Sequence, residues 1–494
     1  MIFLSLFRRN VSRDFFDLMA GAFTTGLPAF GRGISFGPVQ LGSDPRMPKE
    51  PFGNPAALRY FPRPMLDIRL LRDNPDDVKT RLRHRGGDSW TLVDPVLECD
   101  ELRRSGETER QRLQGERNRL SKDIGGLRSR GEDSSALETE VRGIGERIKE
   151  IGEQADAADI RQRDLLMRIP NLPHEDCPLG ADETANPVVR VWGEKPVFDG
   201  FAPQDHVALG QSLKLFDFEA GVRISASGFL VFTGAGARLQ RALIQFLLDL
   251  HTTRHGYREV YTPFIVNRDC MEGTGQLPKF EDDMYGLEDN AFFLAPTAEV
   301  PVTNLYRDTL LGPGDFPVKL TAYTPCFRRE AGSAGRESRG MIRVHQFDKV
   351  ELVNIVAPED SFAQLEILTA EAETVLQLLG LHYRTIELCT GDIGFSSAKT
   401  YDIEVWAPGH GGYLEVSSCS CFGDYQARRM KLRYKDADGK NRFCHTLNGS
   451  GTALPRLYVA LLETCQQADG SIRLPGVLHD YLKAKEILPD GTLR

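Results

Sequence analysis

The chain has 494 residues, enough for two or three domains, and its 41% hydrophobic and 27% charged residues are typical of a globular protein. No apolar run approaches the roughly 20 residues of a membrane span, so we expect no membrane partner. The 61 basic and 70 acidic residues give a net charge of −9. That balance argues against nucleic-acid binding by the whole surface but leaves room for a local basic patch.

Residues 1–64 differ from the rest of the chain, with few acids and no clear period. Arg8, Arg9 and Arg13 flank short apolar pieces, as in a transit peptide, which would place the protein in an organelle. We favour instead a disordered tail or a mis-called start, because Met65 already opens a domain-like sequence. The nine cysteines, with no CxxC pair, are typical of a reduced cytoplasmic protein without a zinc site.

From about residue 91 to 165 the chain is highly charged, and its second half predicts a coiled coil. Apolar residues there recur at alternating intervals of four and three, the a/d pattern of helices that pack against each other. They are Leu137, Val141, Ile144, Ile148, Ile151, Ala155 and Ala158. A turn over 129–134 separates this half from a first half in which Leu92, Cys99, Leu113, Leu120 and Leu127 share one seven-residue phase. We predict an antiparallel helical hairpin that packs little on the rest of the protein.

The first hairpin helix is rich in arginine, which suits phosphate recognition through its forked donors, although a solvated helix face would look the same. The candidates for RNA contact are Arg110, Arg112, Arg117 and Arg119.

Pro170 and Pro173 end the hairpin. We therefore predict a first domain over 65–172, a linker over 173–200, and a second domain of mixed helices and strands over 201–494.

The second domain has no GxxxxGK[ST] phosphate loop, so nucleotide binding would need another device. Phe327-Arg328-Arg329-Glu330, followed by a glycine-rich loop and Arg343 to Phe347, resembles motif 2 of the class II aminoacyl-tRNA synthetases. His255 to Pro263 is similar to motif 1, and Gly449 to Arg456 is similar to motif 3. Each motif alone is weak evidence, but three in the correct order form a strong joint signal.

The features between these motifs resemble the seryl-tRNA synthetase family over residues 65–494. They are Thr297-Ala298-Glu299, Phe347 to Glu351, Glu415 to Ser420 and His445 to Ser450. The resemblance implies an α+β protein in which the N-terminal antiparallel coiled-coil hairpin precedes a catalytic domain. That domain is a six- to seven-stranded antiparallel sheet flanked by helices, and it forms a homodimer. The implied activity is serine–tRNA ligation with ATP and Mg²⁺, on tRNA-Ser and also on tRNA-Sec where that tRNA exists.

The resemblance also implies roles for single residues. Arg328, Glu330 and Arg456 are the implied catalytic residues. Serine would contact Thr297, Ala298, Glu299, Arg328, Glu351 and Ser450. ATP would contact Arg328, Arg329, Glu330, Val344, Phe347, Glu415, Val416, Ser417, Ser418 and Arg456, with Glu415 and Ser418 also holding Mg²⁺. The four hairpin arginines would contact tRNA.

Two other interpretations fit parts of the sequence. A class II relative that loads an amino acid onto a carrier protein would lack the long hairpin. A non-catalytic paralogue would be expected to lose a motif arginine or the metal carboxylate, and Arg328, Glu330, Glu415 and Arg456 are all present. Synthetases for threonine or proline share a TxE string but fit the Asn448 to Ser450 region less well.

Overall fold

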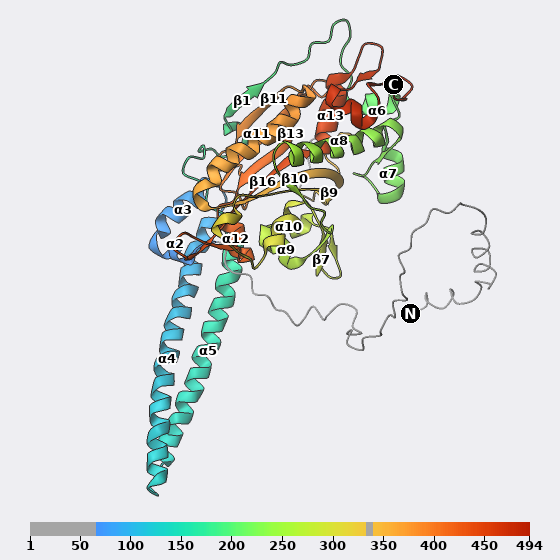
Figure 1. Ribbon diagram of the computed structural model, residues 1–494. Coiled ribbons are helices and arrows are strands. Elements are labelled where there is room, and N and C mark those ends of the chain that lie inside the picture. The colour runs from blue at the N-terminus through green and yellow to red at the C-terminus, as the bar shows by residue number, and fades with distance from the viewer. Residues whose placement is uncertain (1–65, 332–338) are drawn as a thin grey trace, which may run out of the picture. The chain divides into compact units, whose positions relative to one another are not determined.

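The computed structural model describes residues 66–331 and 339–494, so the interpretation of residues 1–64 falls outside the described part of the chain. The predicted fold class is confirmed: a helical hairpin precedes a mixed domain built on a largely antiparallel sheet (Figure 1). Within the described ranges, no helix is both long and apolar enough to cross a bilayer.

The hairpin consists of α4 (Val93–Ser129) and α5 (Ser135–Arg168), which lie side by side in Figure 1. Cys99, Leu113 and Leu120 on α4 are buried, as the seven-residue phase predicts. On α5, Ile151, Ala155 and Ala158 are buried, whereas the four seam residues nearer the turn are half-buried. The two helices alone leave some of the seam accessible, and complete burial is reached only at the base, where Val93, Val96 and Leu166 pack with other elements.

The base of the hairpin packs more deeply on the second domain than we predicted. α2 (Ile68–Asp73), α3 (Pro75–His84) and the hairpin ends bury one apolar cluster. Tyr425 and Phe395 of the second domain are part of that cluster. Tyr425 also donates a hydrogen bond from its hydroxyl to the Ile169 carbonyl, at 2.8 Å. The expectation of little packing therefore holds for the outer hairpin and is wrong for its base.

The second domain is organised around one sheet with the strand order β1-β11-β12-β13-β16-β10-β9-β4. In the described ranges this sheet has eight strands, more than the six or seven expected, and only the short edge strand β4 runs parallel to its neighbour. Its strands are β1 (Val188–Trp192), β4 (Arg258–Glu259), β9 (Val318–Phe327), β10 (Gln346–Val356), β11 (Tyr383–Glu387), β12 (Lys399–Ala407), β13 (Gly412–Cys421) and β16 (His445–Ala453).

One face of the sheet is covered by α8 (Gly234–Thr253), α11 (Ser361–Leu379) and α13 (Leu454–Cys465), which share the main apolar core with it (Figure 1). The other face carries the candidate site. The alternation of strand residues decides which side chains reach it. On β10, Val350 and Leu352 enter the helix-covered core, so Lys349 and Glu351 must face the opposite side.

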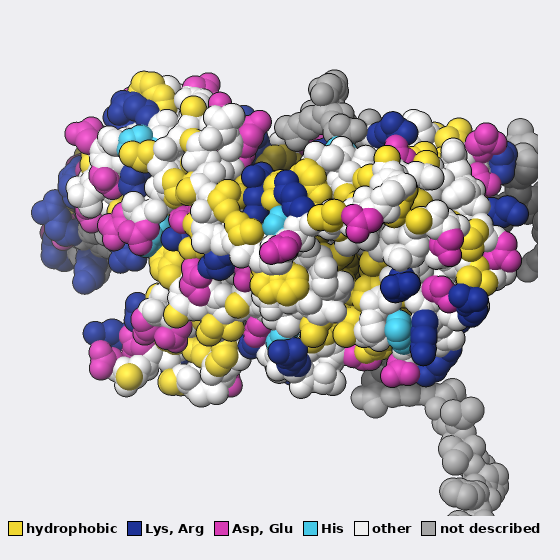
Figure 2. All heavy atoms as spheres, turned by 90° about the horizontal axis from the view of Figure 1, so that it is seen from above, with side chains coloured by type: hydrophobic (Ala, Val, Ile, Leu, Met, Phe, Trp, Pro, Cys, Tyr) yellow, Lys and Arg dark blue, Asp and Glu magenta, His cyan; other side chains and the backbone are white. Residues whose placement is uncertain are grey.

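The remaining elements surround this framework. The helices are α6 (His206–Ser212), α7 (Phe218–Ser225), α9 (Arg268–Thr274), α10 (Glu299–Thr303), α12 (Tyr425–Met430) and α14 (His479–Leu482). The strands are β2 (Phe216–Asp217), β3 (Val231–Phe232), β5 (Ile265–Asn267), β6 (Gly286–Leu287), β7 (Phe292–Leu294), β8 (Leu310–Leu311), β14 (Arg433–Lys435), β15 (Asn441–Phe443), β17 (Ile472–Arg473) and β18 (Glu486–Ile487). The face in Figure 2 intersperses acidic and basic side chains, consistent with the small net charge.

Candidate active site

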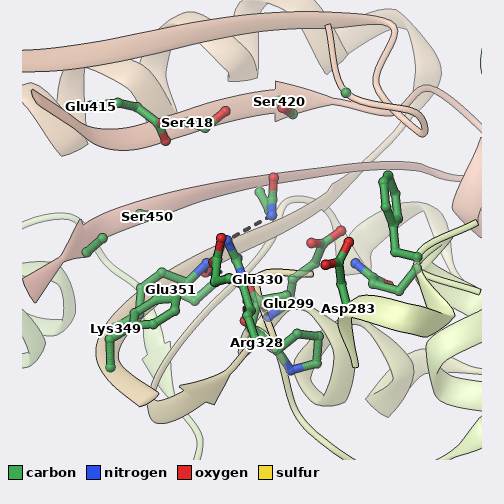
Figure 3. Close-up of a pocket in the computed structure, with 18 of the residues that line it drawn as sticks. Asp283, Glu299, Arg328, Glu330, Lys349, Glu351, Glu415, Ser418, Ser420 and Ser450 are labelled. Carbon is green, nitrogen blue, oxygen red and sulfur yellow. Dashed lines mark hydrogen bonds and ion pairs between the residues drawn. The ribbon is translucent and has the colours of Figure 1, made fainter. Parts of the chain in front are cut away.

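A cavity of about 660 Å³ opens on the face of the sheet that the three long helices leave free. Its lining includes Arg328, Lys349, Glu351, Glu415 and Arg456. Figure 3 shows Glu415 and Ser418 on one strand, with Arg328, Lys349 and Glu351 across the space from them. The cavity therefore joins a cluster of mixed charge at one end to a carboxylate–arginine pair at the other.

Glu351 is the centre of the mixed-charge end and is almost completely buried, with 1% of its surface exposed. Its Oε2 accepts a hydrogen bond from Thr297 Oγ1 at 3.1 Å and pairs with the Lys349 ammonium. Its Oε1 accepts from Asn448 Nδ2 at 3.1 Å. Because a buried carboxylate needs such partners, these contacts satisfy its oxygens and fix its position.

Strand β16 supplies Asn448 and Ser450 to the same end, with glycines between and after them. Ser450 is paired in register with Glu351 on β10. Gly449 and Gly451 point to the helix-covered face, where a Cβ would lie 2.4 Å from Leu368 Cδ2 and 2.7 Å from His251 Nε2 respectively. In the sequence Asn448 to Gly451, the two polar side chains therefore face the cavity. The two glycines face the other side of the sheet, where they let the helices pack close to the strand.

Glu299 is a second buried carboxylate at this end. Burial and the nearby Glu351 carboxylate raise the pKa of Glu299 to about 7. Gln426 Nε2 donates to its Oε1 at 2.6 Å and so orients it. An incoming cation, such as an ammonium group, would favour the ionised form of this side chain.

Arg328 follows β9 and lies beside the aromatic ring of Phe347, with its guanidinium carbon 5.2 Å from the ring centre. Its Nε donates to the Pro296 carbonyl at 3.2 Å. Within the described residues neither Nη atom has a hydrogen-bond partner, so both can bind an anion in the cavity. Glu330 is paired with Arg343 and lines the cavity nearby.

At the other end, Arg456 Nη1 donates to the backbone oxygen of Glu415 at 2.9 Å and to its carboxylate at 3.2 Å. Arg456 Nε also donates to the Ile342 carbonyl at 3.3 Å. Asp402 lies opposite Ser418 on the neighbouring strand. Burial and the Glu415 carboxylate raise the pKa of Asp402 well above its usual range. The local excess of carboxylates favours a cation here.

Most of the predicted substrate-binding residues line this one cavity. They are Thr297, Glu299, Arg328, Glu330, Val344, Phe347, Glu351, Glu415, Val416, Ser418, Ser450 and Arg456. Three others do not line it. Ala298 is buried in a small apolar cluster, and the Arg329 side chain is exposed. Ser417 faces the helices and donates from Oγ to the Ser450 carbonyl at 2.7 Å.

The sequence interpretation missed several lining residues. Lys349 and Asn448 could have been found by strand alternation, because each lies two residues from a predicted site residue on the same strand. Asp283 and the segment Gly394 to Ser397 also line the cavity. Neither belongs to a recognisable motif. They lie between the main strands and helices, in segments whose path through the fold cannot be deduced from local sequence.

The four arginines assigned to tRNA lie on α4, outside the cavity lining. Arg110 pairs with Glu107 at 2.7 Å, and Arg112 pairs with Glu109 and Glu116 at 2.8 and 3.1 Å. In the described part of the chain, Arg117 and Arg119 form no ion pair. The latter two are therefore the more available for phosphate.

Comparisons with known proteins match both domains. The family model described as "Seryl-tRNA synthetase N-terminal domain" matches residues 65–173, and "tRNA synthetase class II core domain (G, H, P, S and T)" matches residues 279–465. The serine–tRNA ligase of Akkermansia muciniphila is 67% identical over 426 residues, which are 86% of this chain and 100% of that protein. That of Thiobacillus denitrificans is 52% identical over 427 residues, 86% and 99% of the two chains.

Solved structures give the same result. Seryl-tRNA synthetase from Pyrococcus horikoshii, complexed with ATP, superposes with a TM-score of 0.82 and 38% identity over 86% of this chain and 99% of that one. Cytoplasmic serine–tRNA ligase from Naegleria fowleri, in complex with AMP, gives a TM-score of 0.77 and 28% identity over 86% and 98%. With both domains matched and the cavity lined by its motifs, the chain belongs to the seryl-tRNA synthetase family.

Proposed function

We propose that the protein activates serine with ATP and transfers it to the 3′ end of tRNA-Ser. The observation that carries this proposal is that one cavity has two ends that suit two different substrates. The mixed-charge end fits a small polar amino acid, and the other end fits a polyphosphate. The named relatives are serine–tRNA ligases, which supports the same activity.

At the mixed-charge end, the Arg328 guanidinium would bind the serine carboxylate and the α-phosphate together, which its forked donors suit. Glu299, once ionised, would pair with the serine ammonium. Glu351 and Ser450 would hydrogen-bond the serine hydroxyl. A substrate without that hydroxyl would leave the Ser450 hydroxyl and the remaining acceptor capacity of Glu351 without a partner in the closed site, a penalty on the order of 10⁴-fold in comparable polar sites.

At the other end, Arg456 would neutralise the outer phosphates, and between the two ends Phe347, beside Arg328, would stack on the base. Glu415 and Ser418 offer the hard oxygen donors that Mg²⁺ prefers, and the carboxylate excess at Asp402 and Glu415 supports a cation there. No cluster of three metal-binding side chains occurs within residues 66–331 and 339–494. That is expected for Mg²⁺, which is bound mainly through nucleotide phosphates and water and supplies charge neutralisation.

The reaction needs no protein nucleophile. The serine carboxylate attacks the α-phosphorus in line and pyrophosphate leaves. The terminal ribose hydroxyl of tRNA then attacks the carbonyl carbon of the seryl-adenylate, which forms the ester, breaks the acyl–phosphate bond and releases AMP and the hydroxyl proton. In this scheme, Arg328 and Arg456 act by positioning and by neutralising charge. The hairpin arginines would bind the tRNA backbone.

We further propose that the protein works as a homodimer. The segment after the edge strand β4 exposes large apolar side chains: Tyr261 is 79% and Ile265 is 53% exposed. Such side chains beside an open sheet edge are typical of a protein–protein interface. The oligomeric state, measured by light scattering, tests this part of the proposal separately.

The activity is tested by serine-dependent exchange of pyrophosphate into ATP and by charging of tRNA-Ser. We expect exchange with serine and none with alanine or threonine at equal concentration. Arg328→Ala should abolish exchange, whereas Arg329→Ala, which changes an exposed neighbour, should retain most of it. A wild-type protein without serine-dependent exchange would overturn the proposal, and equal losses in the two variants would overturn the role of Arg328.

A further inference from the structure

The cavity wall formed by residues 393–398 rests on the N-terminal domain. This segment leads into β12, and four of its residues, Gly394 to Ser397, line the cavity. Arg85, at the end of α3, reaches across to it. Its Nη2 donates to the carbonyls of Ile393 and Gly394 at 3.0 and 2.7 Å, and its Nη1 donates to that of Ser397 at 3.2 Å.

The remaining carbonyls of the segment are bound from the end of the hairpin and the linker. The Asn171 backbone N–H donates to the Phe395 carbonyl at 2.9 Å, and its Nδ2 donates to that of Ser396 at 2.9 Å. The His174 N–H donates to the Ala398 carbonyl at 2.8 Å. Every backbone carbonyl from residue 393 to 398 thus accepts a hydrogen bond from the segment between Arg85 and His174.

The Arg85 guanidinium is partly removed from water where it makes these contacts, and this desolvation costs free energy. Burial lowers the pKa of its guanidinium to about 10, so it stays charged at neutral pH. Among residues 66–331 and 339–494 it forms no ion pair with a carboxylate. Arg85 is half-buried, and a cation withdrawn from water is costly unless its donors are satisfied; here backbone carbonyls satisfy them. The guanidinium therefore fixes the shape of the segment and does not balance a charge.

The supported wall lies at the serine end of the cavity. A Cβ on Gly275 would be 3.0 Å from Ser396 Oγ, so the segment touches the end of α9. Gln426 Nε2 donates to the neighbouring Thr274 carbonyl at 3.0 Å and to Glu299 Oε1 at 2.6 Å. Contacts therefore run from the wall to the carboxylate proposed for the serine ammonium.

A second guanidinium ties the hairpin to the same region. Arg429 is 1% exposed, and its Nη2 donates to the carbonyl of Met167 in α5 at 3.2 Å. Its Nη1 donates to the carbonyls of Glu272 and Leu277, on either side of Gly275 and Gln276, which line the cavity. Both walls at this end are thus held by backbone contacts that cross between the domains.

We propose that the base of the tRNA-binding domain holds the wall of the serine pocket in place, and that Arg85 is a positioning residue for serine. Arg85 does not line the cavity itself and acts through residues 393–398. The inference rests on the proposed function. It adds that serine binding depends on the N-terminal domain of the same chain, even in the step that needs no tRNA.

The test measures pyrophosphate exchange for the full-length protein and three variants at Arg85 and Arg83. Arg85→Gln removes the charge and all but one donor group, Arg85→Lys keeps the charge, and Arg83→Gln is the control. Arg83 is exposed on the same helix, and its guanidinium lies 4.3 Å from the Trp90 ring centre. We expect Arg85→Gln to raise the serine KM at least tenfold and the ATP KM less than twofold. The serine KM of Arg85→Lys should lie between those of wild type and Arg85→Gln, and the serine KM of the Arg83→Gln control should match that of wild type.

Hydrogen exchange of the Ser397 and Ala398 amides gives a readout besides activity, because these amides donate to Gly394 and Cys421 carbonyls within the supported wall. They should exchange faster in Arg85→Gln than in the control. If Arg85→Gln does not fold, Asn171→Ala, which removes the donor to the carbonyls of Ser396 and Phe422, two residues that line the cavity, tests the same support with the same expectation.

Two results distinguish the inference from the proposed function. An inactive wild-type protein would overturn the function. An active wild type whose soluble Arg85 and Asn171 variants keep the serine KM, or lose kcat with both KM values unchanged, would overturn the inference alone.

Discussion

The raised pKa of Glu299 predicts that serine binding depends on pH near neutrality. The side chain is 7% exposed, and burial together with the Glu351 carboxylate brings its pKa to about 7. Below that pH the carboxyl group is protonated and cannot form an ion pair with the serine ammonium. Above it the ionised form is available, so the serine KM should fall as pH rises through 7 and then level off.

The size of the effect follows from the fraction ionised. With a pKa of about 7, half of the Glu299 side chains are ionised at pH 7 and roughly a tenth at pH 6. If only the ionised form binds serine, the serine KM should be about fivefold higher at pH 6 than at pH 7. The ATP KM should change much less, because Glu299 lies at the opposite end of the cavity from Arg456.

Glu299→Gln separates this group from other titrations. The amide has nearly the same shape and cannot ionise, so the variant should bind serine weakly with a serine KM that is flat between pH 6 and 8. Pyrophosphate exchange at saturating ATP across that range is the assay. If wild type and variant show the same pH slope, Glu299 does not control the dependence, and its assignment to the serine ammonium is refuted.

The same shift has a consequence for stability. A carboxyl group whose pKa is raised on folding holds its proton in the folded state between the unfolded pKa, 4.5, and about 7. Ionising it costs folding free energy, so stability is lost as pH rises through that window, by up to about 3 kcal/mol. Without serine, the Tm of wild type relative to Glu299→Gln should fall between pH 4.5 and 7, and added serine should reverse part of that fall.

Three further changes test the site, the core behind it and the hairpin. Lys349→Met should lower the free energy of unfolding by about 3–5 kcal/mol, because Glu351 loses its buried cation; a Tm within 2 °C of wild type would contradict this. Gly449→Ala should cost about 1–3 kcal/mol by overpacking against Leu368, measured by urea unfolding, and an unchanged midpoint would refute the close approach. Arg117→Glu and Arg119→Glu should each weaken tRNA binding and reduce its salt dependence more than Arg110→Glu, since Arg110 is already paired with Glu107; equal effects would refute that distinction.

The sequence was sufficient to predict the hairpin and the motif residues because both depend on local patterns. The alternating spacing of Leu137 to Ala158 predicts a helical seam. Strand alternation does not predict that Glu415 and Ser418 both reach the cavity, because residues three apart on a regular strand face opposite sides of the sheet. A bulge between Ile403 and Glu404 leaves Val416 unpaired and brings both side chains to the cavity.

Other features depend on contacts between distant segments. Arg328 and Arg329 are neighbouring residues of the same type, so residue type does not show which of them enters the cavity. The direction of the backbone after β9 ends at Phe327 places Arg328 in the cavity lining and leaves Arg329 exposed. The support of residues 393–398 comes from backbone carbonyls, which carry no side-chain signal. An arginine more than 300 positions earlier in the chain could not be connected with them by any local pattern.

The outer hairpin and its base should therefore have separable functions. Gly106 and Ile151 face each other across the hairpin, where a Cβ on Gly106 would be 3.6 Å from Ile151 Cγ2. Replacing residues 107–150 by a short Gly-Ser turn removes all four arginines assigned to tRNA and keeps the Asp100–Gln162 contact nearer the base, at 3.2 Å. The shortened protein should keep the serine KM in pyrophosphate exchange within twofold and charge tRNA at least a hundredfold more slowly. Removing α4 and α5 completely, Val93–Ser129 and Ser135–Arg168, also removes the Met167 carbonyl that binds Arg429, so this second deletion should raise the serine KM. If both deletions leave exchange unchanged, the hairpin base does not support the serine pocket; if the shorter deletion charges tRNA normally, the arginines on α4 do not bind tRNA.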